Sequence, residues 1–163
     1  MKLLVFTEGT ILVHSSARGH SREEIVRQVK GKEPSVKQYA RYVPIGSAAE
    51  KLRKWAAQGA EIIYLTSRRD SEEIHDIKKV LNRNNFPKGI LEYRRQREEY
   101  GDVAMRIMPD ILIEDDCKSI GGEKEMTHPH IKPEARARIQ SIVVKEFEGI
   151  DHLPGNLLGS TLP

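Results

Sequence analysis

The chain has 163 residues, of which 38% are hydrophobic and 31% are charged. This composition is typical of one soluble globular domain, and it excludes a disordered chain and a chain of membrane-spanning helices. The longest apolar runs, such as residues 3–6, are far shorter than the roughly 20 residues that a spanning helix needs. Cys117 is the single cysteine and no secretory signal is visible, so we expect a cytoplasmic protein without a membrane partner.

The charge of the chain is small in total but unevenly distributed. The sequence carries 27 Lys and Arg against 24 Asp and Glu, a formal net charge of +3. Residues 18–54 contain ten basic side chains against four acidic ones, whereas residues 110–125 are acidic. A basic stretch can bind nucleic acid, but it is more often a solvated helix surface. We therefore keep a nucleic-acid-binding accessory protein as a third hypothesis, ranked below two that come from the motifs.

Short apolar runs alternate with amphipathic segments, a pattern typical of a parallel sheet covered by helices. Continuous apolar strands are expected where a sheet is buried on both faces. The sequence therefore predicts the α/β class, as a three-layer α/β/α Rossmann-like domain with a parallel sheet of about five strands. The predicted strands are Leu3–Phe6, Glu61–Thr66, Gly89–Tyr93, Ile111–Glu114 and Ser141–Phe147.

Four helices are predicted from capping residues and from apolar side chains at helical spacing. Ser47 and Glu50 form a capping-box sequence, and Gly59 ends the helix that follows. The other three helices begin at Ser21, at Asp70 and at about Arg97.

No repeat, low-complexity tract or long linker divides the sequence, so residues 1–163 are expected to form a single domain. Residues 11–60 are longer than one crossover helix requires, and we expect them to contain a small basic insertion that makes little or no cap. Residues 149–163 contain four leucines among glycine and proline, and they are expected to form an irregular tail. The tail could dock on its own domain or on another subunit.

Ligands of an open parallel sheet bind beyond the carboxyl ends of the strands, so the residues that follow each strand are site candidates. Gly9 would let backbone amides approach an anion, and Thr66 and Ser67 can hydrogen-bond a phosphate oxygen. Asp115 and Asp116 repel each other unless a cation compensates them, and their hard oxygen atoms suit Mg²⁺. Together these residues predict metal-assisted phosphate chemistry.

Three segments resemble motifs of the haloacid dehalogenase-like (HAD) superfamily. Residues 4–12, LVFTEGTIL, resemble its first motif, an apolar strand that ends in D-x-D-G-T. Residues 62–68, IIYLTSR, resemble the second motif, and residues 109–116, PDILIEDD, resemble the fourth, which ends in acidic Mg²⁺ ligands. The resemblance extends over residues 3–122 with matching order and spacing. It implies a phosphohydrolase-type protein that binds a small phosphorylated ligand with Mg²⁺.

The resemblance also implies roles for individual residues. The implied phosphate-binding residues are Gly9, Thr10, Thr66, Ser67, Arg68 and Arg94. The implied metal ligands are Asp115, Asp116 and Glu8, and the candidate catalytic residues are Glu8 and Thr7. The alternatives for the lysine of the third motif are Arg94, Arg95, Arg97, Lys88 and Arg106.

The sequence departs from the family at the catalytic nucleophile. Aligned on the Gly9-Thr10 pair, the acid/base aspartate of the family falls on Glu8. Its nucleophilic aspartate falls on Phe6, whereas a one-residue gap would place Thr7 there. That aspartate forms a covalent phosphate intermediate and binds the metal, so its loss removes two functions. Two hypotheses follow: a phosphatase-like hydrolase in which water or Thr7 replaces the aspartate, and a non-catalytic HAD-fold binding or regulatory module.

Overall fold

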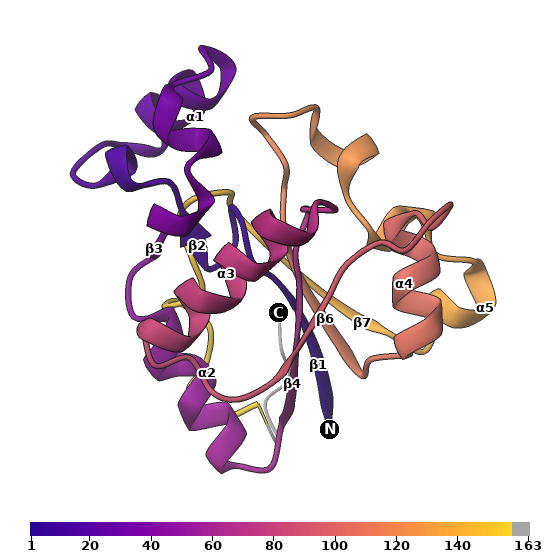
Figure 1. Cartoon of the computed structure of the whole chain (residues 1–163). Coiled ribbons are helices and arrows are strands. Elements are labelled where there is room, and N and C mark those ends of the chain that lie inside the picture. Colours follow the sequence, from indigo (N-terminus) through magenta and orange to yellow (C-terminus); the bar gives the residue numbers. More distant parts are fainter. Residues whose placement is uncertain (158–163) are drawn as a thin grey trace.

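A computed structural model describes residues 1–157, and residues 158–163 of the expected tail lie outside the described part. Its centre is a five-stranded sheet in the order β5-β4-β1-β6-β7, in which every neighbouring pair is parallel (Figure 1). The predicted α/β class is therefore confirmed. The strands are β1 (Lys2–Phe6), β4 (Glu61–Leu65), β5 (Ile90–Glu92), β6 (Ile111–Asp115) and β7 (Gln140–Val144).

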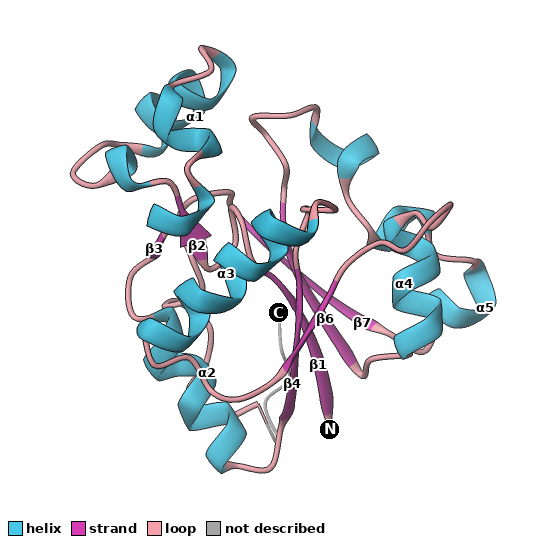
Figure 2. Cartoon of the chain, viewed as in Figure 1, coloured by secondary structure: helices cyan, strands magenta, loops and turns pink. Residues whose placement is uncertain are grey.

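Helices cover both faces of this sheet and produce three layers (Figure 2). Successive side chains of β1 point to opposite faces: Leu3 belongs to the core under α2 and α3, and Leu4 belongs to the core under α4. No helix in residues 1–157 is long and apolar enough to cross a membrane. The helices are α1 (Arg22–Lys30), α2 (Ala48–Ala57), α3 (Ser71–Arg83), α4 (Tyr100–Ile107) and α5 (Pro133–Arg136).

Capping residues explain where two helices begin. Ser21 and Asp70 cap α1 and α3 as predicted, because each side chain accepts a hydrogen bond from a backbone N–H of the first turn. The capping box predicted at Ser47 is wrong, although α2 does begin there. The Ser47 N–H donates to the Asp151 carboxylate at 3.0 Å, and this distant acid takes the place that Glu50 would have in a capping box.

The insertion between β1 and β4 forms a small flap, residues 12–44, beside the carboxyl edge of the sheet (Figure 1). An antiparallel ribbon joins its two ends, and a small apolar cluster that includes Ala17 and Ile25 fills its interior. Besides α1, the flap contains β2 (Leu12–Val13), β3 (Val43–Pro44) and the short 3-10 helices η1 (Ser15–Ala17), η2 (Pro34–Lys37) and η3 (Tyr39–Arg41).

The described part of the tail, residues 149–157, docks on α2 of the same chain. The indole Nε1 of Trp55 donates to the carbonyl oxygen of Pro154 at 3.1 Å. Lys51 and Gln58 donate to two further carbonyl oxygens of the tail. Three apolar side chains of the tail also join the core under α2 and α3. The sequence left open whether the tail docks on its own domain or on another subunit. Residues 149–157 dock on their own domain.

Trp55 tests how much this docking stabilises the fold. We expect Trp55→Phe to lower the free energy of unfolding by about 1 to 2 kcal/mol, because it removes the hydrogen bond to Pro154 and part of the buried ring. Urea denaturation of the full chain measures this change. The control is Lys54→Ala on the exposed side of α2, which should change stability by less than about 0.5 kcal/mol. Equal stability of Trp55→Phe and the wild type would contradict a stabilising role of the tail contact.

Candidate functional site

A cavity of about 320 Å³ lies at the carboxyl edge of the sheet, between the strand ends and the flap. Its sheet side comes from the ends of all five strands, where ligands of parallel sheets bind. The structure therefore brings together six residues that the sequence singled out, from positions far apart in the chain. These are Glu8, Gly9, Ser67, Arg68, Arg94 and Asp115.

Three predicted threonines do not line the cavity but hold its carboxylates. Thr7, Thr10 and Thr66 are completely buried. The Oγ1 hydroxyl of Thr10 donates to Asp115 at 2.8 Å, and that of Thr66 donates to Glu8 at 2.5 Å. The hydroxyl of Thr7 donates to Glu8 as well. Their hydroxyls therefore fix the orientation of two acidic side chains.

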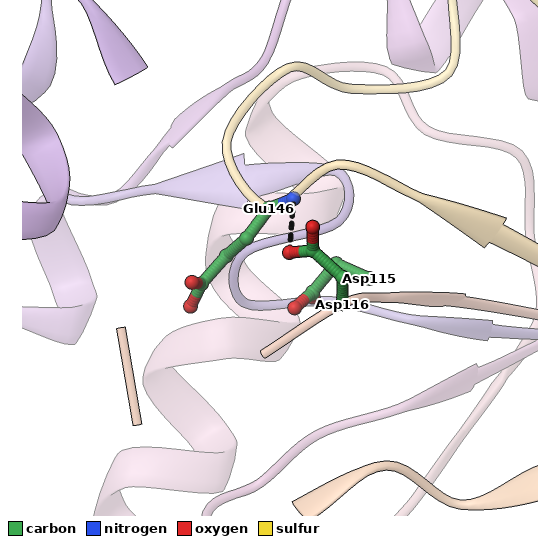
Figure 3. A group of neighbouring side chains, drawn as sticks. All are labelled: Asp115, Asp116 and Glu146. Carbon is green, nitrogen blue, oxygen red and sulfur yellow. Dashed lines mark hydrogen bonds between the residues drawn. The ribbon is translucent and has the colours of Figure 1, made fainter. Parts of the chain in front are cut away.

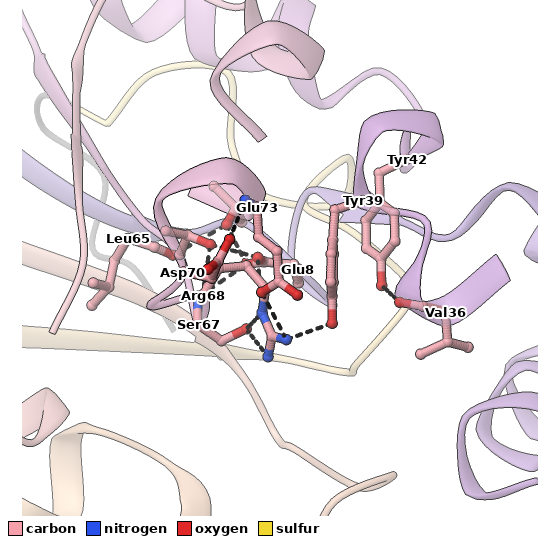
Figure 4. A network of polar contacts seen from close by, with 11 residues as sticks. Glu8, Val36, Tyr39, Tyr42, Leu65, Ser67, Arg68, Asp70 and Glu73 are labelled. Carbon is pink, nitrogen blue, oxygen red and sulfur yellow. Dashed lines mark hydrogen bonds and ion pairs between the residues drawn. The ribbon is translucent and has the colours of Figure 1, made fainter. Parts of the chain in front are cut away.

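Glu8 and Arg68 belong to one polar network that reaches the flap (Figure 4). Glu8 also accepts a 3.3 Å hydrogen bond from the Ser67 N–H, and the Arg68 Nε lies 4.0 Å from its carboxylate. The Arg68 guanidinium donates to the hydroxyl of Tyr39 and lies 4.6 Å from the centre of that ring. A second ion pair, at 3.7 Å, joins Arg68 to Glu73 of α3. Arg68 is thus oriented from both sides of the cavity.

Arg94, which follows β5, lines the cavity with an incomplete set of hydrogen-bond partners. Its guanidinium lies 4.2 Å from the centre of the Tyr100 ring, and its Nη1 lies 3.7 Å from the exposed Glu99 carboxylate. Its buried Nε has no hydrogen-bond partner within the described residues. Among the alternatives for the third-motif lysine, Arg94 lines the cavity, whereas the others do not: Lys88, Arg95, Arg97 and Arg106.

Three carboxylates gather beside the cavity (Figure 3). Asp115, Asp116 and Glu146 each offer an oxygen atom, and these atoms lie within 4.8 Å of one another. Burial raises the pKa of Asp115 and that of Glu146 above their ordinary values. Three carboxylates this close together offer hard oxygen ligands, which fit Mg²⁺ or a similar divalent cation. Glu8, which the sequence placed among the metal ligands, is held by Thr66 instead and is not part of this group.

Arg22, at the start of α1, already pairs with one of these carboxylates. Its Nη2 donates to both carboxylate oxygens of Asp116, at 2.8 and 2.7 Å, and its Nε donates to the Glu146 carbonyl oxygen at 2.9 Å. Only 11% of the Arg22 side chain is exposed. The sequence does not indicate this pair, because the partners are 94 positions apart and Arg22 lies in a stretch typical of solvated surface. The flap is thereby tied to the acidic edge.

Glu146 is a site residue that the sequence does not indicate, because the last predicted strand extends too far. The prediction ran to Phe147, but β7 ends at Val144, so Glu146 lies just beyond the strand end. Its carboxylate accepts two 2.6 Å hydrogen bonds from Ser119, one from the backbone N–H and one from the hydroxyl. The change from apolar to charged residues at Lys145 is the signal that could have placed the strand end correctly.

Gly9 allows the loop after β1 to approach the acidic group closely. Its φ of +84° lies in the left-handed region, which favours glycine. A Cβ atom at this position would lie 2.8 Å from the Asp115 Oδ2, closer than such atoms can approach. From the sequence we expected Gly9 to let an anion approach the backbone closely. In the structure the carboxylate of Asp115 makes this close approach.

Phe6 and Thr7, the two alternatives for the nucleophile position, differ in where they lie. The ring of Phe6 lines the cavity and contacts Tyr100 edge to face, with ring centres 5.0 Å apart. Thr7 is buried outside the cavity lining, and its hydroxyl also lies 3.3 Å from the carbonyl oxygen of Leu65. The side chain that reaches the cavity from this part of the first motif is therefore apolar.

A family model described as "PITM 1-3, LNS2 domain" matches residues 21–108, which is more than half of the chain. The matched range includes α1 of the flap, Arg68 and Arg94, and it ends before β6. No curated protein matches the sequence.

One solved phosphatase structure shares the fold, and a second is less similar. A class C acid phosphatase from Bacillus anthracis, solved with tungstate bound, superposes with a TM-score of 0.57 at 12% identity, covering 91% of this chain and 68% of that one. A D,D-heptose 1,7-bisphosphate phosphatase from Burkholderia thailandensis gives a TM-score of 0.48 at 10% identity, with coverages of 90% and 93%. At these identities the first likeness shows the fold, that of the HAD phosphatases.

The ion pair of Arg22 gives a direct test of the acidic edge. We expect Arg22→Ala to lower the free energy of unfolding by about 1 to 3 kcal/mol, because it leaves Asp116 unpaired beside two other carboxylates. Mg²⁺ should stabilise this variant more than the wild type, because both cations use the same carboxylate. Urea denaturation with and without Mg²⁺ measures both effects.

The matched control for this test is Arg27→Ala, an exposed arginine on the same helix. It should change stability by less than about 0.5 kcal/mol, as surface substitutions usually do. If Arg22→Ala behaved like Arg27→Ala in both media, the pair with Asp116 would not hold the flap.

Proposed function

This chain belongs to the family described as "PITM 1-3, LNS2 domain", and from that premise we propose that it is a HAD-fold module that binds a phosphomonoester group. The phosphate lies in the cavity at the carboxyl edge of the sheet, in reach of Arg68 and Arg94. Asp115, Asp116 and Glu146 are the residues that would hold a divalent cation, which supplies charge neutralisation for an anion bound nearby. The chain does not transfer the phosphoryl group to one of its own side chains.

The observation that carries this proposal is the incomplete pairing of Arg94. A buried guanidinium nitrogen without a hydrogen-bond partner is costly, and a ligand oxygen can supply the missing acceptor. The long contact to Glu99 leaves most of the positive charge available to an anion. Arginine also matches the geometry of a phosphate group, because its parallel N–H groups can bind two oxygen atoms at once.

Arg68 and Ser67 supply the second side of the phosphate site. The Arg68 Nε and Nη2 lie 3.2 and 3.1 Å from the Ser67 hydroxyl, so the two polar groups form one unit at the cavity wall. Tyr39 holds the guanidinium by its hydroxyl and its ring, which limits the entropy lost when an anion is bound. Two arginines at the ends of neighbouring strands thus face the same cavity.

The absence of covalent transfer is inferred from the first motif. Phe6 brings a ring, which has no nucleophilic atom, to the position of the family's aspartate. The Thr7 hydroxyl donates to Glu8 and has no exposed surface, so it cannot meet a ligand in the cavity without rearrangement. The Glu8 carboxylate lines the cavity and keeps a hydrolysis through water as the second candidate function.

Phosphate binding is tested by thermal unfolding with inorganic phosphate and Mg²⁺. Saturating ligand should raise the melting temperature of the wild type by about 5 to 10 °C, by linkage. Arg94→Met should lose most of this shift, because it removes the charge and the unpaired nitrogen. Arg95→Met, an exposed neighbour outside the cavity lining, is the control and should keep the shift. No shift in the wild type would contradict the proposal.

The two candidate functions are separated by an assay for phenol release from phenyl phosphate with Mg²⁺. We expect the wild type to bind phenyl phosphate but to release no more phenol than Asp115→Asn does. Release that is present in the wild type and lost in Asp115→Asn would favour the hydrolase, with Glu8 and water in place of the missing aspartate.

A further inference from the structure

The cavity has a polar half and an apolar half. The polar half lies at the strand ends and holds the two arginines with carboxylates such as Glu8 and Asp115, although the rings of Phe6 and Tyr100 also line it. The other half is formed mainly by the flap, with two residues from the loops after β6 and β7. The apolar side chains that line this second half are Val13, Val29, Val36, Tyr39, Tyr42, Ile120 and Phe147.

The tyrosines of the apolar half offer ring surface rather than free hydroxyls. The rings of Tyr39 and Tyr42 lie with their centres 5.2 Å apart (Figure 4). The Tyr42 hydroxyl donates to the carbonyl oxygen of Val36 at 2.6 Å, and the Tyr39 hydroxyl accepts from Arg68. Because both hydroxyls have partners within the protein, a ligand group on this side meets aromatic carbon.

Ile120 is an apolar residue that lines the same cavity and is exposed to solvent. Its side chain is 60% exposed, although it is large, and it lies in the loop after β6. Val29 and Val36, which are only partly buried, line the cavity from the flap. A single exposed isoleucine is ordinary, but three incompletely buried aliphatic side chains on one cavity gain free energy when a ligand covers them.

We propose that the phosphomonoester bound at this site carries a compact aromatic group. The phosphate lies at Arg68 and Arg94, and the aromatic group lies against Tyr39, Val36 and Ile120. This inference rests on the proposed function and specifies its ligand class.

Two properties of the cavity favour this class over other phosphomonoesters. A volume of about 320 Å³ holds a phosphate and one ring system. A sugar phosphate would place hydroxyl groups against Val36 and Ile120, where they would lose hydrogen bonds to water without replacement. Aromatic groups also pack edge to face or offset against rings such as that of Tyr39.

The test compares monoesters of equal charge by calorimetry on the full chain with Mg²⁺. Phenyl phosphate should bind about tenfold more tightly than methyl phosphate, because the ring covers apolar side chains that the methyl group does not reach. Glucose 6-phosphate should bind no more tightly than methyl phosphate. Hexyl phosphate should bind more weakly than phenyl phosphate, because a flexible chain does not pack against rings as a planar group does.

Substitutions at the cavity mouth locate the aromatic group. Ile120→Ser should reduce the advantage of phenyl over methyl phosphate several-fold and leave the affinity for methyl phosphate unchanged. Val36→Ser should act in the same direction. Ile90→Ser is the matched control, because Ile90 is 61% exposed on β5 but does not line the cavity, and it should leave both affinities unchanged.

The outcomes distinguish this inference from the proposed function. Equal affinity for phenyl and methyl phosphate, or tighter binding of glucose 6-phosphate or hexyl phosphate, would overturn the aromatic ligand class while phosphate binding stands. Absence of binding for all four monoesters would overturn both. An undiminished preference for phenyl phosphate in Ile120→Ser and Val36→Ser would show that the ring does not occupy the flap side.

Discussion

The arrangement of the carboxyl edge depends on one constraint, the gathering of acidic side chains where three strands end. Charges removed from water need partners, and the partners here come from the loops and from the flap. Glu114, deep in the sheet, accepts hydrogen bonds from the backbone N–H groups of Thr127 and His128, which fixes the long loop after β6. Glu146 in turn fixes the turn that contains Ser119. Burial raises the pKa of Glu114 and of Glu146, and the hydrogen bonds from the loops offset part of this effect. The arrangement of the loops around the cavity therefore follows from the positions of the acidic side chains.

Polar contacts add to the apolar packing that holds the flap over the cavity, in which Leu12, Tyr39 and Tyr42 of the flap belong to the main core. Arg22 of the flap crosses to Asp116 of the core, and Arg68 of the core crosses to Tyr39 of the flap. These two reciprocal contacts come from opposite sides, and the cavity lies between them. The net charge of +3 thus conceals a separation of charge, with a basic flap held against an acidic sheet edge.

The sequence predicted the sheet well because its three central strands, β1, β4 and β6, contain continuous apolar runs, as strands buried on both faces require. It also placed Ser67, Arg68, Arg94 and Asp115 at one edge, since parallel strands bring their carboxyl ends together. It could not predict contacts set only by tertiary distance. Nothing local to Arg22 indicates that its partner lies 94 residues away, and the basic residues around it are indeed mostly exposed. The end of the last strand was predicted wrongly for a different reason: the predicted strand continued past the charged residues Lys145 and Glu146, whereas pairing with β6 stops at Val144.

The proposed absence of a nucleophile and the proposed binding of phosphate are physically connected. A carboxylate at the position of Phe6 would place a negative charge next to Tyr100 and Arg94, where it would repel a phosphate and compete for the guanidinium. The phenyl ring removes that charge and packs against Tyr100, whose other contact is the Arg94 guanidinium at 4.2 Å from its ring centre. Arg94 consequently keeps a buried nitrogen without an internal acceptor, a state that water or an anion relieves. The apolar side chain of Phe6 therefore gives Arg94 no carboxylate to pair with on this side, and under the proposed function the guanidinium stays available to a phosphate.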